Sequence, residues 1–200
     1  VLGLMVGVGA AFLREFLDDR IRQPEDLEAV DPRLVSLAAI PIADGKGGDN
    51  NIVSLEDPDG IVAESYRRLR SSIVFMAATQ DLQVIQVTSA SQSEGKSTTV
   101  ANLAVALARA GKRVVVVDAD LRRPRQHRLF GLADSPGLSD LVVGSHLAED
   151  VAYRPLPDTA LAVITAGSAV PNPAEMLSLA ITDELMASLA DAADIVIVDS

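Results

Sequence analysis

From residue 82 onward, the hydrophobic and polar positions of the chain fall into two kinds of segment. Short runs of consecutive apolar residues are separated by longer stretches that are rich in Ala and Leu. Continuous apolar runs are typical of strands buried on both faces, and the longer stretches are typical of the helices that cover them. The pattern predicts strands at 84–87, 114–117, 161–165 and 195–198, and helices at 98–110 and 174–189. We therefore expect a doubly wound α/β fold with a mostly parallel sheet.

The beginning of the chain is organised differently. Residues 1–13 carry no charge, and a stretch with several Arg, Glu and Asp residues follows at once. A helix of this length spans about 20 Å, whereas the hydrocarbon core of a bilayer is about 30 Å thick. We interpret residues 1–23 as the end of a transmembrane helix, whose beginning is missing, together with its charged cytoplasmic flank. The alternative is a buried helix of a soluble protein.

The rest of the chain is predicted to form a linker and one domain. Residues 24–60 are rich in Pro, Asp and Gly, which is typical of a linker, here a juxtamembrane one. Helical spacing begins again at 61–80, so we place a single domain at 61–200. The last predicted strand stops as it reaches Asp199. We therefore expect the chain to be a fragment truncated at this strand, with the C-terminal part of the domain missing.

Composition excludes several classes of protein. The 200 residues include no Cys and two His, which excludes a disulfide scaffold and a Cys-based metal site and leaves oxygen atoms as the main metal ligands. Aromatic residues make up 3% of the chain and the net charge is −11, so nucleic-acid binding is not expected. Residues 61–130, however, carry 11 Lys and Arg against 5 Asp and Glu, a net charge of +6. This excess favours a local site for an anion such as phosphate.

A candidate phosphate-binding loop follows the first predicted strand. Residues 88–98 read T-S-A-S-Q-S-E-G-K-S-T and lead into a helix, which is the context of a Walker A motif. In such a loop, backbone N–H groups and the helix N-terminus surround the phosphates. Lys96 would neutralise phosphate oxygens and the Ser97 hydroxyl would bind Mg²⁺. The candidate nucleotide-binding residues are Ser91, Gln92, Ser93, Glu94, Gly95, Lys96, Ser97 and Thr98. Ala90 and Ser93 stand where such loops often have Gly, and each narrows the backbone freedom.

Acidic residues end two of the predicted strands. The apolar strand at 114–117 leads into Asp118 and Asp120, two residues apart, whose side chains would point the same way on a strand. Both could then face one metal ion or one incoming hydroxyl group. Asp199 ends another apolar strand in the manner of a Walker B acid. The carboxyl edge of an open α/β sheet is where ligands bind, so these residues are candidate catalytic and metal-binding groups.

Together these elements resemble the bacterial tyrosine kinases (BY-kinases) of the polysaccharide co-polymerase type, which are P-loop proteins of the deviant-Walker class. Their phosphate loop reads T-S-x-x-P-G-E-G-K-S-T, and here Gln92 and Ser93 replace Pro-Gly. The family element D-A-D-L-R-R-P is matched in full at 118–124. The family's E-x-x-R-x-x-R helix is matched by Glu64, Arg67 and Arg70. The resemblance covers nearly the whole chain.

The resemblance implies an ATP- and Mg²⁺-dependent protein-tyrosine autokinase that regulates capsular or exopolysaccharide polymerisation and export. It implies that Lys96 and Ser97 hold phosphates and Mg²⁺, and that Asp120 and Asp199 organise the metal. Asp118 would accept the proton of the attacking tyrosine or bind metal. Glu64, Arg67 and Arg70 would form the intersubunit contacts of a ring, such as an octamer, in which tyrosines are phosphorylated in trans. Expected partners are the chain itself and the polysaccharide export machinery, at the bacterial inner membrane with the kinase domain in the cytoplasm.

Two alternatives remain open at the level of sequence. A ParA- or MinD-like ATPase switch shares the fold, but that group has an additional lysine where this chain has Ser91. A catalytically weak chain-length or assembly protein would fit Ala90 and Ser93. The tyrosine-rich tail typical of the family is not seen, since Tyr66 and Tyr153 are the two tyrosines of the sequence.

Overall fold

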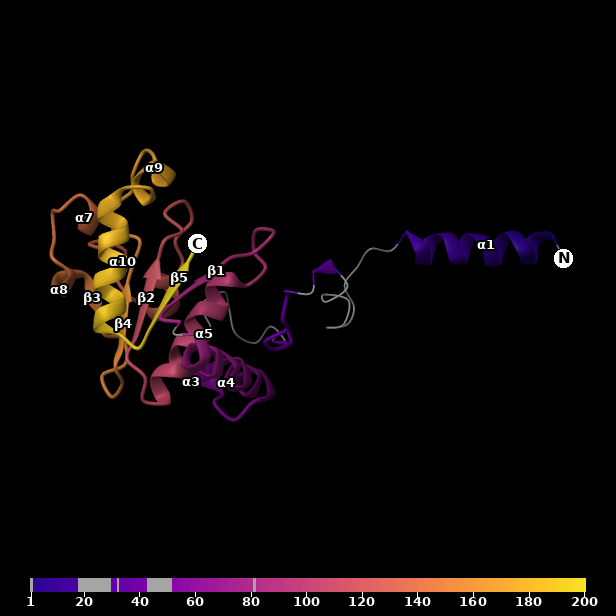
Figure 1. Cartoon of the computed structure of the whole chain (residues 1–200), viewed down its shortest axis with the longest axis horizontal. Coiled ribbons are helices and arrows are strands. Elements are labelled where there is room, and N and C mark those ends of the chain that lie inside the picture. Colours follow the sequence, from indigo (N-terminus) through magenta and orange to yellow (C-terminus); the bar gives the residue numbers. More distant parts are fainter. Residues whose placement is uncertain (1, 18–29, 32, 43–51, 81) are drawn as a thin grey trace. The chain divides into compact units, whose positions relative to one another are not determined.

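The structure, a computed structural model, describes residues 2–17, 30–31, 33–42, 52–80 and 82–200 (Figure 1). The chain divides into two compact units, Val1–Leu37 and Ala38–Ser200. In the first unit, α1 (Leu2–Phe16) is a 15-residue helix. No helix in the described parts of the chain is both long and apolar enough to cross a membrane. That residues 1–13 end a transmembrane helix stays a prediction, and most of its predicted flank lies outside the described residues.

The second unit contains a five-stranded sheet, counted over the described residues, in the order β1-β5-β2-β4-β3. The four strands that the apolar runs predict pair in parallel, and each agrees with its prediction to within one residue at either end. Their bounds are Val84–Val87 for β1, Val114–Asp118 for β2, Leu161–Ile164 for β4 and Ile195–Asp199 for β5. The two-residue β3 (Ala152–Tyr153) joins the edge of the sheet in the antiparallel sense. The mostly parallel α/β sheet is confirmed.

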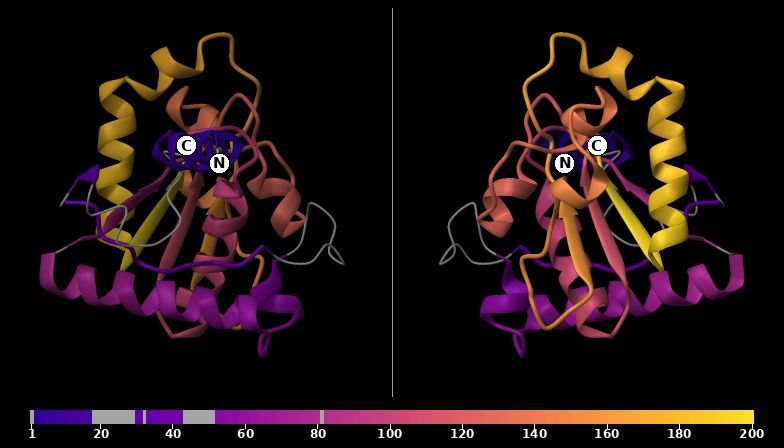
Figure 2. Two further views of the ribbon diagram at one scale, coloured as in Figure 1. Left: turned by 90° about the vertical axis from the view of Figure 1, so that its right-hand side faces the viewer. Right: turned by 90° about the vertical axis from the view of Figure 1, so that its left-hand side faces the viewer.

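Helices cover both faces of this sheet (Figures 1 and 2). On one face, α5 (Lys96–Arg109) contacts β2, β4 and β5 and buries an apolar side that includes Val100, Leu103 and Leu107. Beside it, α4 (Ile61–Gln80) runs crosswise to the strands, and the short α3 (Val53–Glu56) packs against both helices. The backbone N–H of Ser54 donates to Oδ1 of Asn102 at 2.8 Å, so part of the predicted linker is attached to the domain.

The opposite face of the sheet is covered by α10 (Ala180–Ala192) and by shorter helices. Their apolar side chains and those of the sheet form one buried cluster, which consists of Val117, Leu138, Val142, Val151, Ile164, Leu189, Ala190, Ala193 and Val196. The shorter helices are α7 (Leu138–Val142), α8 (Ala148–Val151) and α9 (Pro173–Leu177), whereas α6 (Gln126–Phe130) packs against α5. Burial on both faces explains why the central strands are continuous apolar runs.

One predicted helix is wrong in its continuity. The segment 174–189 was expected to be a single helix, but α9 ends at Leu177 and α10 begins at Ala180. Leu179 between them has an extended backbone, with φ −72° and ψ 142°. The Ser178 hydroxyl donates to the carbonyl of Glu175 at 2.8 Å and the Thr182 hydroxyl donates to that of Met176 at 3.1 Å. Such local side-chain bonds compete with helical ones, and this accounts for the break.

The strand register decides where the site forms. Asp118 at the end of β2 lies directly beside Asp199 at the end of β5, and Val87 at the end of β1 lies on the other side of Asp199. The chain leaves β1 at this same edge and turns back into α5. The candidate loop and the candidate carboxylates therefore meet at the carboxyl ends of three neighbouring strands.

Candidate functional site

The loop between β1 and α5 has the backbone of a phosphate cradle. Gly95 precedes the first residue of α5 in a left-handed conformation, with φ +88°, and Ser93 has φ +66°. Positive φ is uncommon for a residue other than Gly and costs about 1–2 kcal/mol, so Ser93 carries the strain that its place in the motif predicts. The Glu94 carboxylate accepts the backbone N–H of Ser91 at 3.1 Å. Gly95 has no side chain to cap α5, so the N–H groups of the first turn of this helix can bind an anion.

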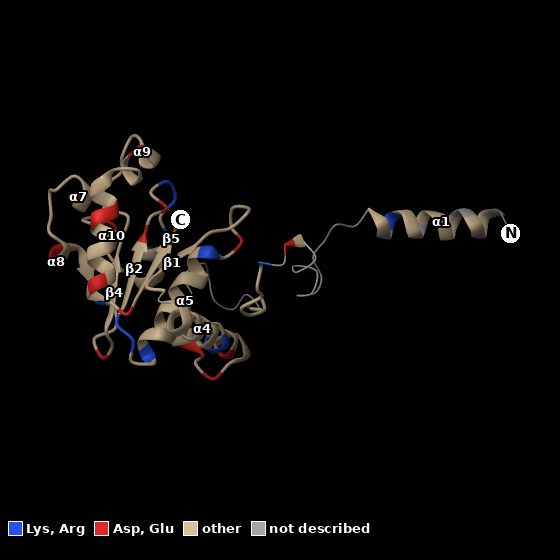
Figure 3. Ribbon diagram, in the orientation of Figure 1, with Lys and Arg blue, Asp and Glu red and all other residues tan. Residues whose placement is uncertain are grey.

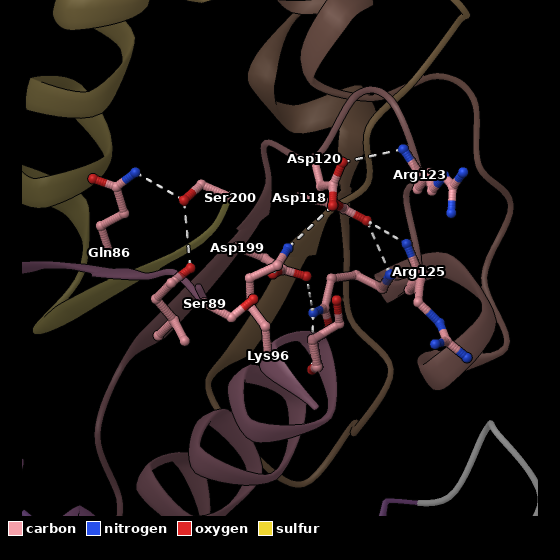
Figure 4. Close-up of polar contacts among 12 residues, drawn as sticks. Gln86, Ser89, Lys96, Asp118, Asp120, Arg123, Arg125, Asp199 and Ser200 are labelled. Atoms are coloured by element: carbon pink, nitrogen blue, oxygen red, sulfur yellow. Dashed lines mark hydrogen bonds and ion pairs between the residues drawn. The ribbon is translucent and has the colours of Figure 1, made fainter. Parts of the chain in front are cut away.

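Lys96 lies between two carboxylates (Figure 4). Its Nζ is 2.8 Å from Oδ1 of Asp199 and 3.1 Å from Oδ2 of Asp120. Burial alone would lower the pKa of Lys96, but the hydrogen bonds and charges of the two aspartates outweigh it and raise the pKa. Burial alone would raise the pKa of Asp120, but hydrogen bonds from Lys96 and from backbone N–H groups of the following loop outweigh it and lower the pKa. Lys96 and Asp120 are therefore both charged at neutral pH.

Asp118 is buried and is held by backbone N–H groups. It has no exposed surface, and its Oδ2 accepts the backbone N–H groups of Arg125 at 3.1 Å and Gln126 at 2.9 Å. Its Oδ1 has no hydrogen-bond partner among the described residues. Burial raises the pKa of Asp118 to about 7, against the hydrogen bonds from Gln126, and the neighbouring Asp199 charge adds to the rise. A carboxyl group with such a pKa can take up or release a proton near neutral pH.

The two aspartates of the D-A-D element do not share a partner. The sequence suggested that Asp118 and Asp120 point the same way, but β2 ends at Asp118 and Asp120 lies in the turn beyond it. Asp120 instead shares Lys96 with Asp199, and its Oδ1 accepts the backbone N–H of Arg123 at 3.1 Å. The acidic edge is thus divided into two carboxylates, Asp120 and Asp199, that hold Lys96, and one, Asp118, that is held by backbone N–H groups.

Gln126 is a site residue that the sequence analysis missed. Its side chain is completely buried, and Nε2 donates to Oδ2 of Asp199 at 2.7 Å and to the Ser97 carbonyl at 3.1 Å. The sequence could have identified Gln126 through its spacing from Leu129. The two residues are three apart and share the buried side of α6. A polar residue at a core position needs a polar partner, and here that partner is the acidic edge.

A cavity of about 180 Å³ lies over these groups. It is lined by Ser89, Gln92, Ser93, Glu94, Gly95, Lys96, Ser97, Thr98, Asp120, Arg123 and Arg125. The structure therefore places every candidate nucleotide-binding residue at this cavity except Ser91. Figure 3 shows acidic residues at the end of β2 and basic residues in the loop that follows and at the start of α5. Positive charge and free N–H groups at one rim suit phosphate groups.

The side chains of the site could bind a divalent cation if phosphate oxygens supplied the remaining ligands. The described residues contain no group of three or more His, Cys, Asp or Glu that could hold a metal ion. The carboxylates of Asp120 and Asp199 already share one cationic group, the Lys96 ammonium, so this position attracts positive charge. Together with the Ser97 hydroxyl they offer oxygen ligands, which is the donor set that Mg²⁺ prefers, and phosphate oxygens would complete it.

The candidate subunit-contact residues of α4 are engaged within the chain. Arg67 Nε lies 2.7 Å from Oε2 of Glu64, and the same guanidinium donates to the carbonyl of Pro58. Arg70 donates to the carbonyl of Ala106 at 3.5 Å. The hydrogen bond and charge of Arg67 lower the pKa of Glu64. These contacts hold the Arg side chains in place, and the ring contact itself stays a prediction.

Comparison with known proteins agrees with this geometry. Residues 85–171 match the protein-family model of the CobQ/CobB/MinD/ParA nucleotide binding domain. The chain is 37% identical over 156 residues to the tyrosine-protein kinase YwqD of Bacillus subtilis (strain 168), an alignment that covers 78% of this chain and 65% of YwqD. It spans only 28–30% of the longer curated relatives.

Solved structures resemble this chain more closely when they are kinase domains than when they are ATPases of the alternative class. The BceF tyrosine kinase domain superposes with a TM-score of 0.80 and 31% identity, over 90% of this chain and 76% of that one. The septum site-determining protein MinD of Pyrococcus horikoshii OT3, solved with Mg-ADP, gives 0.50 and 26%, over 59% and 48%. The nucleotide-binding core is common to both, but the likeness to the kinase domain extends over far more of the chain. The deviant-Walker P-loop fold is confirmed, and the chain belongs to the family of bacterial tyrosine kinases.

Proposed function

We propose that the protein transfers the γ-phosphoryl group of ATP to protein tyrosine as an autokinase that regulates capsular or exopolysaccharide polymerisation and export. The observation that carries the proposal is the position of Lys96. The phosphate loop delivers its ammonium group between Asp120 and Asp199, next to the proton-binding Asp118. The names of the kinase relatives and the likeness to the BceF kinase domain support it.

On the nucleotide side, the phosphates would lie in the cavity over the first turn of α5. Lys96 would then leave its carboxylates and bind β- and γ-phosphate oxygens, while loop N–H groups hold the rest. Mg²⁺ held by Ser97, Asp120 and Asp199 would withdraw negative charge from the phosphates. Arg123 and Arg125 line the same cavity and would add positive charge beside the transferred group.

On the acceptor side, Asp118 would take the proton of the tyrosine hydroxyl. The phenolic oxygen forms a bond to the γ-phosphorus, the bond from that phosphorus to the β,γ-bridging oxygen breaks, and ADP leaves. A second, open groove of about 730 Å³, lined by Leu121, Arg122 and residues 170–175, adjoins this site through the loop after β2. The acceptor segment would approach through this groove.

The chain's own two tyrosines are poor acceptors. Tyr66 is 4% exposed, and its hydroxyl shares a hydrogen bond with Thr99. The hydroxyl of Tyr153 donates to the carbonyl of Pro136 at 3.2 Å. An assay of the chain therefore needs an added tyrosine substrate.

The proposal is tested with the purified protein, γ-labelled ATP, Mg²⁺ and a random copolymer of glutamate and tyrosine. Labelled phosphotyrosine in the copolymer is the expected product. Release of labelled phosphate without phosphotyrosine would instead support the ParA- or MinD-like ATPase. Nucleotide binding with neither product would support a catalytically weak assembly protein.

We further propose a ring of subunits anchored at the cytoplasmic side of the bacterial inner membrane, with α4 as the subunit contact. Glu64, Arg67 and Arg70 are spaced at i, i+3 and i+6, so they share one broad side of the helix. Their contacts within the chain already hold these side chains in place, so they would lose little conformational entropy when two subunits associate. Changing all three to Ala is expected to give monomers whose Mg·ATP binding is unchanged.

The measurement is sedimentation velocity of wild type and triple variant. Arg68→Ala is the matched control, because Arg68 lies on the same helix with its side chain 75% exposed and only a 3.7 Å contact to Glu64. The ring loses its support if wild type and triple variant sediment as the same oligomer, or if both are monomers.

A further inference from the structure

Gln126 connects three elements of the site. Its backbone N–H donates to Asp118 at the end of β2, and its side-chain Nε2 donates to Asp199 at the end of β5 and to the carbonyl of Ser97 in the first turn of α5. The whole side chain is enclosed, with no exposed surface. A buried amide that joins the two acidic strand ends to the phosphate-binding helix can transmit the position of each to the others.

The carboxylate of Asp199 is held at both oxygens by different partners. Oδ1 lies 2.8 Å from the ammonium of Lys96, and Oδ2 lies 2.7 Å from Nε2 of Gln126. A carboxylate otherwise turns freely about its terminal bond, since that torsion has no sharp preference. Once Lys96 moves to the phosphates, Gln126 remains as the side chain that fixes which oxygen of Asp199 faces the cavity.

We infer that Gln126 is a positioning residue that orients Asp199 for a Mg²⁺–nucleotide complex. The inference rests on the proposed function only in requiring that the site binds Mg·nucleotide. Partners of this kind, which hold a ligating carboxylate from behind, commonly change metal affinity about 10- to 100-fold when they are removed. Gln126 acts on the reaction through Asp199 and makes no contact with phosphate itself.

A purely structural role is the competing explanation, because Gln126 also ties α6 to α5. Gln126→Met separates the two. Met has nearly the same shape and removes the bonds to Asp199 and Ser97, but it also removes Oε1, a buried acceptor with no partner among the described residues. These effects on folding oppose each other, so we expect a small change in melting temperature.

Asn102→Leu is the matched control. Asn102 is also fully buried, and its amide donates to an α5 carbonyl, that of Thr98, at 2.9 Å. Its other partner is the Ser54 N–H, on α3, and no carboxylate contacts it in the described structure. Like Gln126→Met, this substitution removes a buried amide that donates to an α5 carbonyl, but it leaves the acidic edge unchanged.

The experiment measures the Kd of ADP by calorimetry with Mg²⁺ and with EDTA, and compares the ratio of the two values. Gln126→Met should reduce the gain from Mg²⁺ by about 10-fold or more and leave the affinity in EDTA within about twofold. Asn102→Leu should keep the wild-type ratio. Should the Met variant not fold, Gln126→Asn, whose shorter amide does not reach Asp199, gives the same comparison.

An unchanged ratio in a folded Gln126 variant overturns the inference. So does a parallel loss of affinity in Mg²⁺ and in EDTA, because that pattern belongs to a structural role. The proposed function fails separately, and the inference with it, if the wild type binds ADP no more tightly with Mg²⁺ than without it.

Discussion

Lys96→Met is expected to reduce phosphotyrosine formation by about 10³-fold or more, because no other group in the phosphate loop supplies a mobile positive charge to the transferred phosphate. The structure adds a second effect that the sequence does not reveal. Lys96 is 13% exposed at its side chain and neutralises Asp199, which has no exposed surface. Its removal leaves a buried carboxylate without an ionic partner, so we also expect a lower melting temperature.

Lys96→Arg distinguishes these two effects. Arginine keeps a positive charge beside Asp120 and Asp199, so its melting temperature should stay close to that of the wild type. Its planar guanidinium cannot replace a compact ammonium within the loop, so activity should still fall at least about 100-fold. The measurements are labelled phosphate in the glutamate–tyrosine copolymer and thermal unfolding. Normal phosphotyrosine formation by either variant would remove Lys96 from the proposed mechanism.

Sequence reasoning worked where local pattern and local chemistry agree. The apolar runs predicted the four parallel strands, and the G-K-S segment between a strand and a helix predicted the loop that lines the cavity. Ser93, identified as a departure from glycine, takes the left-handed backbone that makes glycine favourable there.

It failed where the outcome depends on tertiary contacts. The two-residue spacing suggested that Asp118 and Asp120 point the same way, but β2 ends at Asp118, and Asp120 shares Lys96 with Asp199 on the neighbouring strand. Gln126 comes to the site because α6 folds back over the strand ends. The break at Ser178 comes from hydroxyl groups that compete with helical hydrogen bonds, which the apolar spacing of 174–189 does not register.

Asp118→Asn is expected to lower phosphotyrosine formation by about 10²–10⁴-fold, the usual contribution of a general base, with little change in Mg·ATP affinity. Asp118 has no exposed surface beneath Arg125 and Gln126, so we expect the loop at 120–125 to shift when the acceptor binds. Asparagine keeps an oxygen for these two N–H groups but cannot take the proton. If ATP affinity and phosphorylation fall in parallel, Asp118 is a metal ligand and another group must take the proton.

The same substitution should make the protein more stable. Folding raises the pKa of Asp118 from 3.8 to about 7, so the folded state binds this proton more tightly than the unfolded state does. The free energy of unfolding of the wild type therefore falls as the pH rises from about 4 to about 7, because the buried carboxyl group loses its proton. Above that range the buried charge lowers the free energy of unfolding by on the order of 4 kcal/mol. Asparagine is uncharged at every pH, so it does not lower the free energy of unfolding in this way.

The melting temperature of Asp118→Asn should thus match that of the wild type near pH 4 and exceed it by several degrees at pH 8. A variant that loses both activity and stability at pH 8 would show that the charged carboxylate stabilises the fold. The assignment of Asp118 as a proton acceptor whose pKa is raised by burial would then be wrong.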